Sequence, residues 1–255
     1  MFVDTHTHLD FDIYDEDREK VIQRAIENQV IAIITIGTDV ETSKQAILLA
    51  EKYASIFASV GIHPSDCANV KNKDFQFIRE LASHEKVVAI GEVGLDYYHM
   101  HAEKEIQHSA FKNQIQIARE LNLPLIIHNR DSHQDMLKVL KEENVKDIGG
   151  VMHSFTGDID FLEKIISMNM HVSFTGNITF KKSTSDDLVK KAPVENLLLE
   201  TDSPFMTPVP LRGKRNEPAF IVHTAKRIAE LKEIDLELLG RITTENAKNL
   251  FKIDI

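Results

Sequence analysis

The sequence predicts an α/β protein, and within that class a single (β/α)8 TIM-like barrel whose metal site lies at the C-terminal ends of the strands. Eight short apolar segments alternate with longer segments of helical periodicity along the 255 residues. Such alternation predicts parallel strands joined by right-handed crossovers. The length also suits one barrel, since this fold typically needs about 250 residues. No linker or low-complexity segment interrupts the pattern, so we expect residues 1–255 to form one domain.

The expected strands are nearly continuous apolar runs, which is typical of parallel strands that are covered on both faces. They are Phe2–Asp4, Val30–Ile36, Ile56–Val60, Val87–Ile90, Leu125–Ile127, Ile148–Met152, His171–Phe174 and Leu197–Leu199. An open doubly wound sheet is the alternative. It would favour a glycine-rich phosphate loop after the first strand, but Thr5-His6-Thr7-His8 stands there instead.

The expected helices carry apolar residues three and four positions apart. They are Glu16–Gln29, Val40–Tyr53, Phe75–His84, Lys104–Leu121, Ser132–Glu143, Ile159–Met168, Asp186–Lys191 and a final helical region, Ala219–Phe251. Ser132 is expected to act as an N-cap, because its hydroxyl can accept from a free backbone N–H group. We expect the final region to break near Asp235 and again near Thr243.

Composition narrows the classes of protein that the chain can represent. It has 42% hydrophobic and 27% charged residues, which is ordinary for a globular protein, and a formal net charge of −10. This charge argues against a protein that coats nucleic acid through a basic field, but a nuclease with bound cations is compatible with it. We expect no membrane span and no signal peptide. Cys67 is the lone cysteine, which indicates a reducing cytoplasm.

Potential metal ligands gather at the predicted strand ends. His6 and His8 lie two residues apart, so both side chains point to one face of an extended strand. Five more follow later strands: His63, Glu92, His128, His153 and Asp202. A single strand-end histidine is more often structural, but seven imidazoles and carboxylates at one rim indicate a metal site. They suit borderline divalent cations and exceed the needs of one tetrahedral ion.

These residues lie in motifs that resemble those of the TatD family of metal-dependent hydrolases. The motifs are His6-Thr7-His8, Gly91-Glu92-Val93-Gly94-Leu95-Asp96, His153-Ser154-Phe155, Glu200-Thr201-Asp202-Ser203-Pro204 and Arg212-Gly213-Lys214-Arg215-Asn216-Glu217-Pro218. The resemblance runs from Val3 to about Phe251. It implies a TIM-like barrel, deoxyribonuclease activity and two divalent metals. His6, His8 and Asp202 would hold one metal, His128 and His153 the other, and Glu92 would bridge them.

The resemblance leads to a hydrolytic mechanism in which Glu92 and Asp202 are catalytic. The two metals, whether zinc, nickel, manganese, cobalt or magnesium, would activate a water for attack on a phosphodiester. Asp202 would ligate one metal and accept a proton from that water. The alternative for Asp202 is a helix N-cap, because Pro204 follows it in the manner of a first-turn proline.

Five residues are expected to contact the substrate: His63, Arg130, Arg212, Lys214 and Arg215. Phosphate binding after strand 8 is common in this fold, and three of these cations follow that strand. The alternatives are a structural His63, a solvated or ion-paired Arg130 and a solvated charge run at 212–215. Tyr97, Tyr98 and Phe180 could stack on bases, but packing at the rim explains them equally well.

Two enzymatic functions and one non-enzymatic function follow from these residues. A deoxyribonuclease acting on DNA is the leading hypothesis. The alternative enzyme is a small-molecule amide, ester or lactone hydrolase that uses the same two metals. A non-catalytic metal-binding protein is disfavoured by the number of ligands and the apparent general base. We expect no obligate protein partner and no membrane association.

Overall fold

The computed structural model describes residues 1–255 and contains one sheet of eight parallel strands in the order β1 to β8. The strands are β1 Phe2–Thr7, β2 Val30–Ile36, β3 Ile56–Val60, β4 Val87–Asp96, β5 Leu125–Arg130, β6 Gly150–Met152, β7 Met170–Phe174 and β8 Leu197–Leu199. A parallel bridge between Thr7 and Ser203 brings β1 against the end of β8. The Thr5 hydroxyl also donates to the Leu199 carbonyl at 3.0 Å. The predicted (β/α)8 barrel is therefore confirmed.

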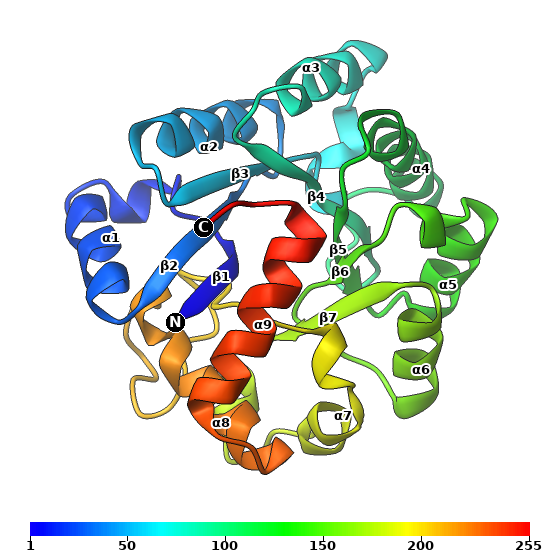
Figure 1. The fold of residues 1–255 in the computed structure, drawn as a ribbon. Coiled ribbons are helices and arrows are strands. Elements are labelled where there is room, and N and C mark those ends of the chain that lie inside the picture. Colours follow the sequence, from blue (N-terminus) through cyan, green and yellow to red (C-terminus); the bar gives the residue numbers. More distant parts are fainter.

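Helices surround the sheet, as Figure 1 shows. They are α1 Arg18–Glu27, α2 Val40–Lys52, α3 Asn72–Ala82, α4 Lys104–Leu121, α5 His133–Glu142, α6 Ile159–Ser167, α7 Asp186–Lys191, α8 Ile221–Lys232 and α9 Leu236–Phe251. The predicted bounds of α4 and α7 are confirmed, and those of the other outer helices are correct to within three residues. No helix of the chain is both long enough and apolar enough to cross a bilayer.

The last helix, α9, lies across one end of the barrel (Figure 1). Its residues Ala247 and Phe251 join a buried cluster with strand residues such as Val3, Ile34 and Ile126. At Gly240 a Cβ atom would lie 2.7 Å from the Met1 carbonyl oxygen, so glycine permits the close approach of α9 to β1. Since α9 covers the end of the barrel where β1 begins, the opposite end is left for the site.

The two breaks expected in the final helical region have different outcomes. The break near Asp235 is confirmed, because α8 ends before a left-handed Glu233 and Asp235 precedes α9. The break near Thr243 is wrong. The Thr243 hydroxyl donates to the Leu239 carbonyl at 2.9 Å within the helix, so the polar side chain finds a partner without interrupting it.

Strands β4 and β5 are longer than expected and carry Glu92 and His128 within them. Strand β4 was expected to end at Ile90, but Gly91 and Gly94 lie within it and allow close packing. A Cβ atom on Gly91 would lie 2.5 Å from Ile126 Cβ, and one on Gly94 would lie 2.0 Å from the His128 carbonyl oxygen. Pairing between β4 and β5 shifts register between Ile90 and Val93, at the place where Glu92 is set.

Ser132 occupies the N-cap position of α5, but its hydroxyl makes no capping bond. The hydroxyl lies 3.1 Å from the Leu95 carbonyl oxygen and 2.7 Å from Asn129 Oδ1. The expected capping role is therefore wrong, and the side chain instead ties the start of α5 to the ends of β4 and β5.

Candidate metal centre

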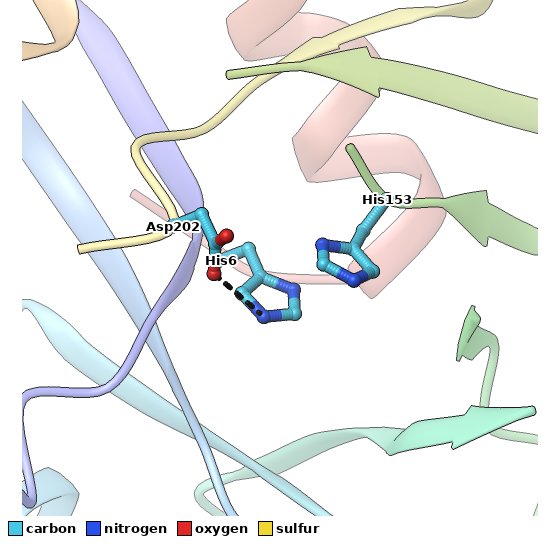
Figure 2. Close-up of side chains that lie close together, drawn as sticks. All are labelled: His6, His153 and Asp202. Atoms are coloured by element: carbon cyan, nitrogen blue, oxygen red, sulfur yellow. Dashed lines mark ion pairs between the residues drawn. The ribbon is translucent and has the colours of Figure 1, made fainter. Parts of the chain in front are cut away.

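The predicted ligands converge at the carboxyl end of the barrel. His6, Glu92 and His128 belong to β1, β4 and β5, and His8, His153 and Asp202 follow β1, β6 and β8. All except His128 are buried. Figure 2 shows three of them: the rings of His6 and His153 stack with centroids 4.0 Å apart, and Asp202 lies beside His6.

Glu92 lies between two groups of imidazoles. Its Oε2 atom is 3.4 Å from His6 Nε2 and 3.9 Å from His8 Nε2. Its Oε1 atom is 2.8 Å from both His128 Nδ1 and His153 Nε2. The two oxygens of one carboxylate thus face two different sets of ligands.

The first group is completed by Asp202, whose Oδ1 atom lies 3.7 Å from the Nε2 atoms of both His6 and His8. Ligand atoms held at about 2.1 Å from one tetrahedral cation lie roughly 3.4 Å apart. The separations between Asp202 and the two histidines therefore fit a shared cation. His8 donates from Nδ1 to the Ile36 carbonyl at 3.2 Å, which leaves Nε2 free to ligate. Both ring nitrogens of His6 are buried without a hydrogen-bond partner, so Nε2, which faces Glu92 and Asp202, is free to ligate a cation.

The second group consists of His128 and His153, whose facing nitrogens are 3.4 Å apart. His128 Nε2 donates to Asp96 Oδ2 at 3.0 Å. This bond places the proton on Nε2 and leaves the Nδ1 lone pair directed at Glu92. The chemistry of both groups therefore suits imidazole-rich and carboxylate ligation of divalent cations.

The pKa values of the ionisable side chains in this site are governed by burial and by the charge of Glu92. Burial favours neutral His6 and lowers its pKa to about 4. Burial also opposes a charge on His153, but the Glu92 carboxylate outweighs this and raises the His153 pKa to about 10. For Glu92, burial works against ionisation, yet the histidines, His153 first, hold its pKa well below the ordinary value. Because ligation requires a neutral imidazole, a cation must displace the proton of His153.

His63 also points at Glu92, with Nε2 3.4 Å from Oε1. The Ser65 backbone N–H donates to His63 Nδ1 at 3.1 Å, so the proton of the neutral ring is on Nε2. Burial lowers the His63 pKa, which favours this neutral form. His63 therefore presents a donor, whereas His6, His8 and His128 can present lone pairs.

The alternative role for Asp202, an N-cap, is wrong. No helix begins after Pro204, and the Asp202 side chain accepts no bond from a following backbone N–H group. Asp202 has a φ of +54°, a conformation uncommon for a residue with a side chain and frequent at functional sites. Asn216 holds this segment by donating to the carbonyls of Thr201 and Phe205 at 3.0 and 2.6 Å.

Two buried carboxylates of the site received no role from the sequence. Asp96 orients His128, and its Oδ1 accepts from the backbone N–H groups of Tyr98 and His99. Glu200 accepts from the Ser154 backbone N–H at 2.6 Å and lies 3.9 Å from His153 Nδ1. Both lie in the motifs of the sequence, but only the three-dimensional structure shows which histidine each one faces.

The four predicted substrate cations lie in different environments. Arg212 and Lys214 are exposed and form no ion pair, and Arg130 is exposed with its guanidinium 4.9 Å from the Tyr98 ring. Arg215 instead pairs with Asp17 at 2.7 Å and donates to the Ile13 carbonyl at 2.6 Å. Its guanidinium therefore holds the loop in place and is already neutralised by Asp17, so Arg215 is not available to bind a phosphate.

Comparison with known proteins decides the family. The model of the family described as TatD related DNase matches residues 3–252. The chain belongs to this family. A protein of Bacillus subtilis (strain 168) named as the uncharacterized metal-dependent hydrolase YabD is 48% identical over 255 residues, which is 100% of both chains. The 3'-5' ssDNA/RNA exonuclease TatD of Shigella flexneri serotype 5b is 35% identical over 244 residues, covering 93% of this chain and 94% of that protein.

A solved structure agrees with the TatD fold. The crystal structure of YjjV, a TatD homologue from Escherichia coli K12, superposes with a TM-score of 0.91 at 28% identity, covering 99% of this chain and 98% of that one. The chain is thus a metal-dependent hydrolase of the TatD family, as predicted.

The contact between Asp96 and His128 leads to a first prediction. In Asp96→Asn the amide oxygen should stay on the backbone N–H groups of Tyr98 and His99, so the NH2 group would face His128 Nε2–H, donor against donor. We expect metal affinity to fall about 10- to 100-fold, as is usual when such a partner is lost, with turnover recovering at high metal concentration. Metal titration of the purified variant measures this. A metal affinity equal to that of the wild-type enzyme would show that Asp96 only stabilises the backbone at Tyr98 and His99.

Proposed function

We propose that this TatD-family hydrolase cleaves phosphodiester bonds in nucleic acid, with DNA as a substrate and two divalent cations as cofactors. The observation that supports two cations is the orientation of Glu92. One oxygen faces His6 and His8, which are joined by Asp202, and the other faces His128 and His153. A carboxylate with ligands at both oxygens suits a bridging role.

Burial of the ligands favours a single strand over a duplex as the substrate. The ligands are buried at the mouth of the barrel, whereas a phosphodiester inside a duplex is flanked by its partner strand. The exposed cations Arg212 and Lys214 follow β8, where phosphate sites of this fold are frequent. The relative from Shigella flexneri is named as an exonuclease on ssDNA and RNA, which supports the same substrate class.

Bound divalent cations would lower the pKa of a water molecule and offset charge on the phosphate. The chain's own groups supply the remaining functions. His6, His8 and Asp202 would hold one cation, His128 and His153 the other, and Glu92 would contact both.

Asp202 and His63 would act on the reacting groups. Burial opposes ionisation of Asp202, but His8 and the neighbouring histidines lower its pKa, so the carboxylate is ready to accept a proton from the attacking water. Its Oδ1 faces the histidines, which leaves Oδ2 for that proton. Neutral His63 would donate from Nε2 to a phosphate oxygen, and Arg130, Arg212 and Lys214 would bind phosphates along the strand.

We further propose a cytoplasmic location. The lone cysteine, Cys67, is buried, and burial raises the pKa of its thiol to about 11, so it suits a reducing compartment without serving as a reactive nucleophile.

A substrate comparison tests the proposed function. The metal-loaded enzyme is assayed on single-stranded DNA and RNA oligonucleotides with free or blocked ends, and on panels of lactones, amides and esters. We expect nucleotide release from free-ended oligonucleotides. Hydrolysis confined to the small-molecule panel would establish the alternative hydrolase.

Metal removal gives the second prediction. Chelation should abolish hydrolysis while circular dichroism keeps most of its helical signal, because the large apolar core is independent of the site. Restoring divalent metal should restore activity. Collapse of the helical signal on chelation would show that the cations are structural.

A further inference from the structure

A cleft lined mostly by polar residues lies at the carboxyl end of the barrel, the end that also holds the metal centre. It has a volume of about 530 Å³ and is formed by the segments that follow β6, β7 and β8. Lys181, Lys182 and Arg212 contribute cations to its walls, and Thr156 and Asn177 contribute a hydroxyl and an amide. Serine and threonine hydroxyls of residues 183–185 add further donors, and no aspartate or glutamate lines the cleft.

The cations of this cleft are not neutralised within the protein. Lys181, Lys182 and Arg212 are exposed, and none forms an ion pair, whereas cations elsewhere, such as Arg24 and Arg227, are paired with carboxylates. Arg212 lies 4.1 Å above the Phe180 ring, a cation–π contact that fixes its position. In a chain of net charge −10, three unpaired cations around one cleft form a local anion site.

The place of the cleft in the fold relates it to the metal centre. Thr156 comes three residues after His153, and Arg212 comes ten residues after Asp202. The lysines follow β7, which pairs with β6 on one side and β8 on the other. The cleft therefore flanks the sector of the barrel from which His153 and Asp202 reach the centre.

We propose that this cleft is a subsite for the backbone of a single-stranded nucleic acid beyond the bond that is cleaved. This inference rests on the proposed nuclease function. Cations, hydroxyls and amides are the groups that contact phosphates in protein–nucleic acid complexes, and a guanidinium plane also stacks on bases. A mononucleotide bound at the metal centre would leave the cleft empty, so the cleft gives the enzyme a preference for longer strands.

A pair of double variants tests the subsite. Lys181→Ala with Lys182→Ala removes two cations of the cleft. Lys141→Ala with Lys146→Ala is the matched control, since both lysines are exposed, lie just before β6 at the opposite end of the barrel, and form no ion pair. The measurement is kcat/KM for a single-stranded decanucleotide divided by kcat/KM for a dinucleotide, with manganese as the added metal.

We expect this ratio to fall about tenfold or more in the cleft variant and to equal the wild-type ratio in the control. The log–log salt slope for decanucleotide binding should decrease by about 0.7 for each lost phosphate contact. If the cleft variant had the same kcat/KM ratio as the control and cleaved the decanucleotide at the wild-type rate, the subsite would be refuted. The proposed nuclease function would not be affected by that result. A wild-type enzyme that cleaves neither substrate would overturn both.

Discussion

Glu92→Gln should lose at least one bound cation and reduce turnover by about a hundredfold or more. Glutamine keeps the size of the side chain, but it replaces one oxygen by an NH2 group that cannot ligate a cation. Because Oε1 and Oε2 face different histidines, either orientation of the amide deprives one group of its shared ligand. The measurements are metal content by elemental analysis and kcat on a single-stranded oligonucleotide.

Glu217→Gln is the matched control for this experiment. Glu217 is also a buried glutamate, but it pairs with Arg24 at 2.6 Å, away from the ligands. The control should retain full metal content. Two bound cations together with near-normal turnover in Glu92→Gln would refute the bridging role and leave the site to His6, His8, His128, His153 and Asp202.

Asp202→Asn should reduce kcat by roughly 10²- to 10⁴-fold, the range expected when a general base is lost. Asparagine tolerates a positive φ, so the backbone at +54° should persist and the thermal midpoint should change little. The amide cannot accept the proton of the attacking water, and it weakens one ligand of the first group. Measuring kcat at saturating metal separates the two effects, because only the ligand effect recovers there.

If Asp202→Asn kept wild-type turnover at saturating metal, Asp202 would act as a ligand only. The proton acceptor would then have to be sought among other groups at the mouth, such as His63.

The sequence predicted the barrel because its strands are covered on both faces and therefore appear as uninterrupted apolar runs, such as Ile56–Val60. It also predicted which residues gather at the strand ends, since the carboxyl ends of parallel strands meet at one mouth. The ligand roles of these residues remain predictions, although the distances around Glu92 suit them.

Other features depend on contacts between distant residues, which local sequence patterns do not encode. The glycines of β4 resemble turn residues in sequence, but Gly94 serves the close approach of His128. Arg215 looked like part of a free basic loop, yet Asp17, almost two hundred residues earlier in the chain, neutralises it. The tautomer of His63 follows from a backbone N–H two residues away, and Asp96 could be matched with His128 only in three dimensions.

A crystal structure of the manganese-loaded enzyme, solved with anomalous scattering, tests most directly whether two divalent cations bind on either side of Glu92. We expect two anomalous peaks per chain, one contacting His6, His8 and Asp202 and the other contacting His128 and His153, with a Glu92 oxygen on each. A single peak, or two peaks that Glu92 does not join, would contradict this expectation.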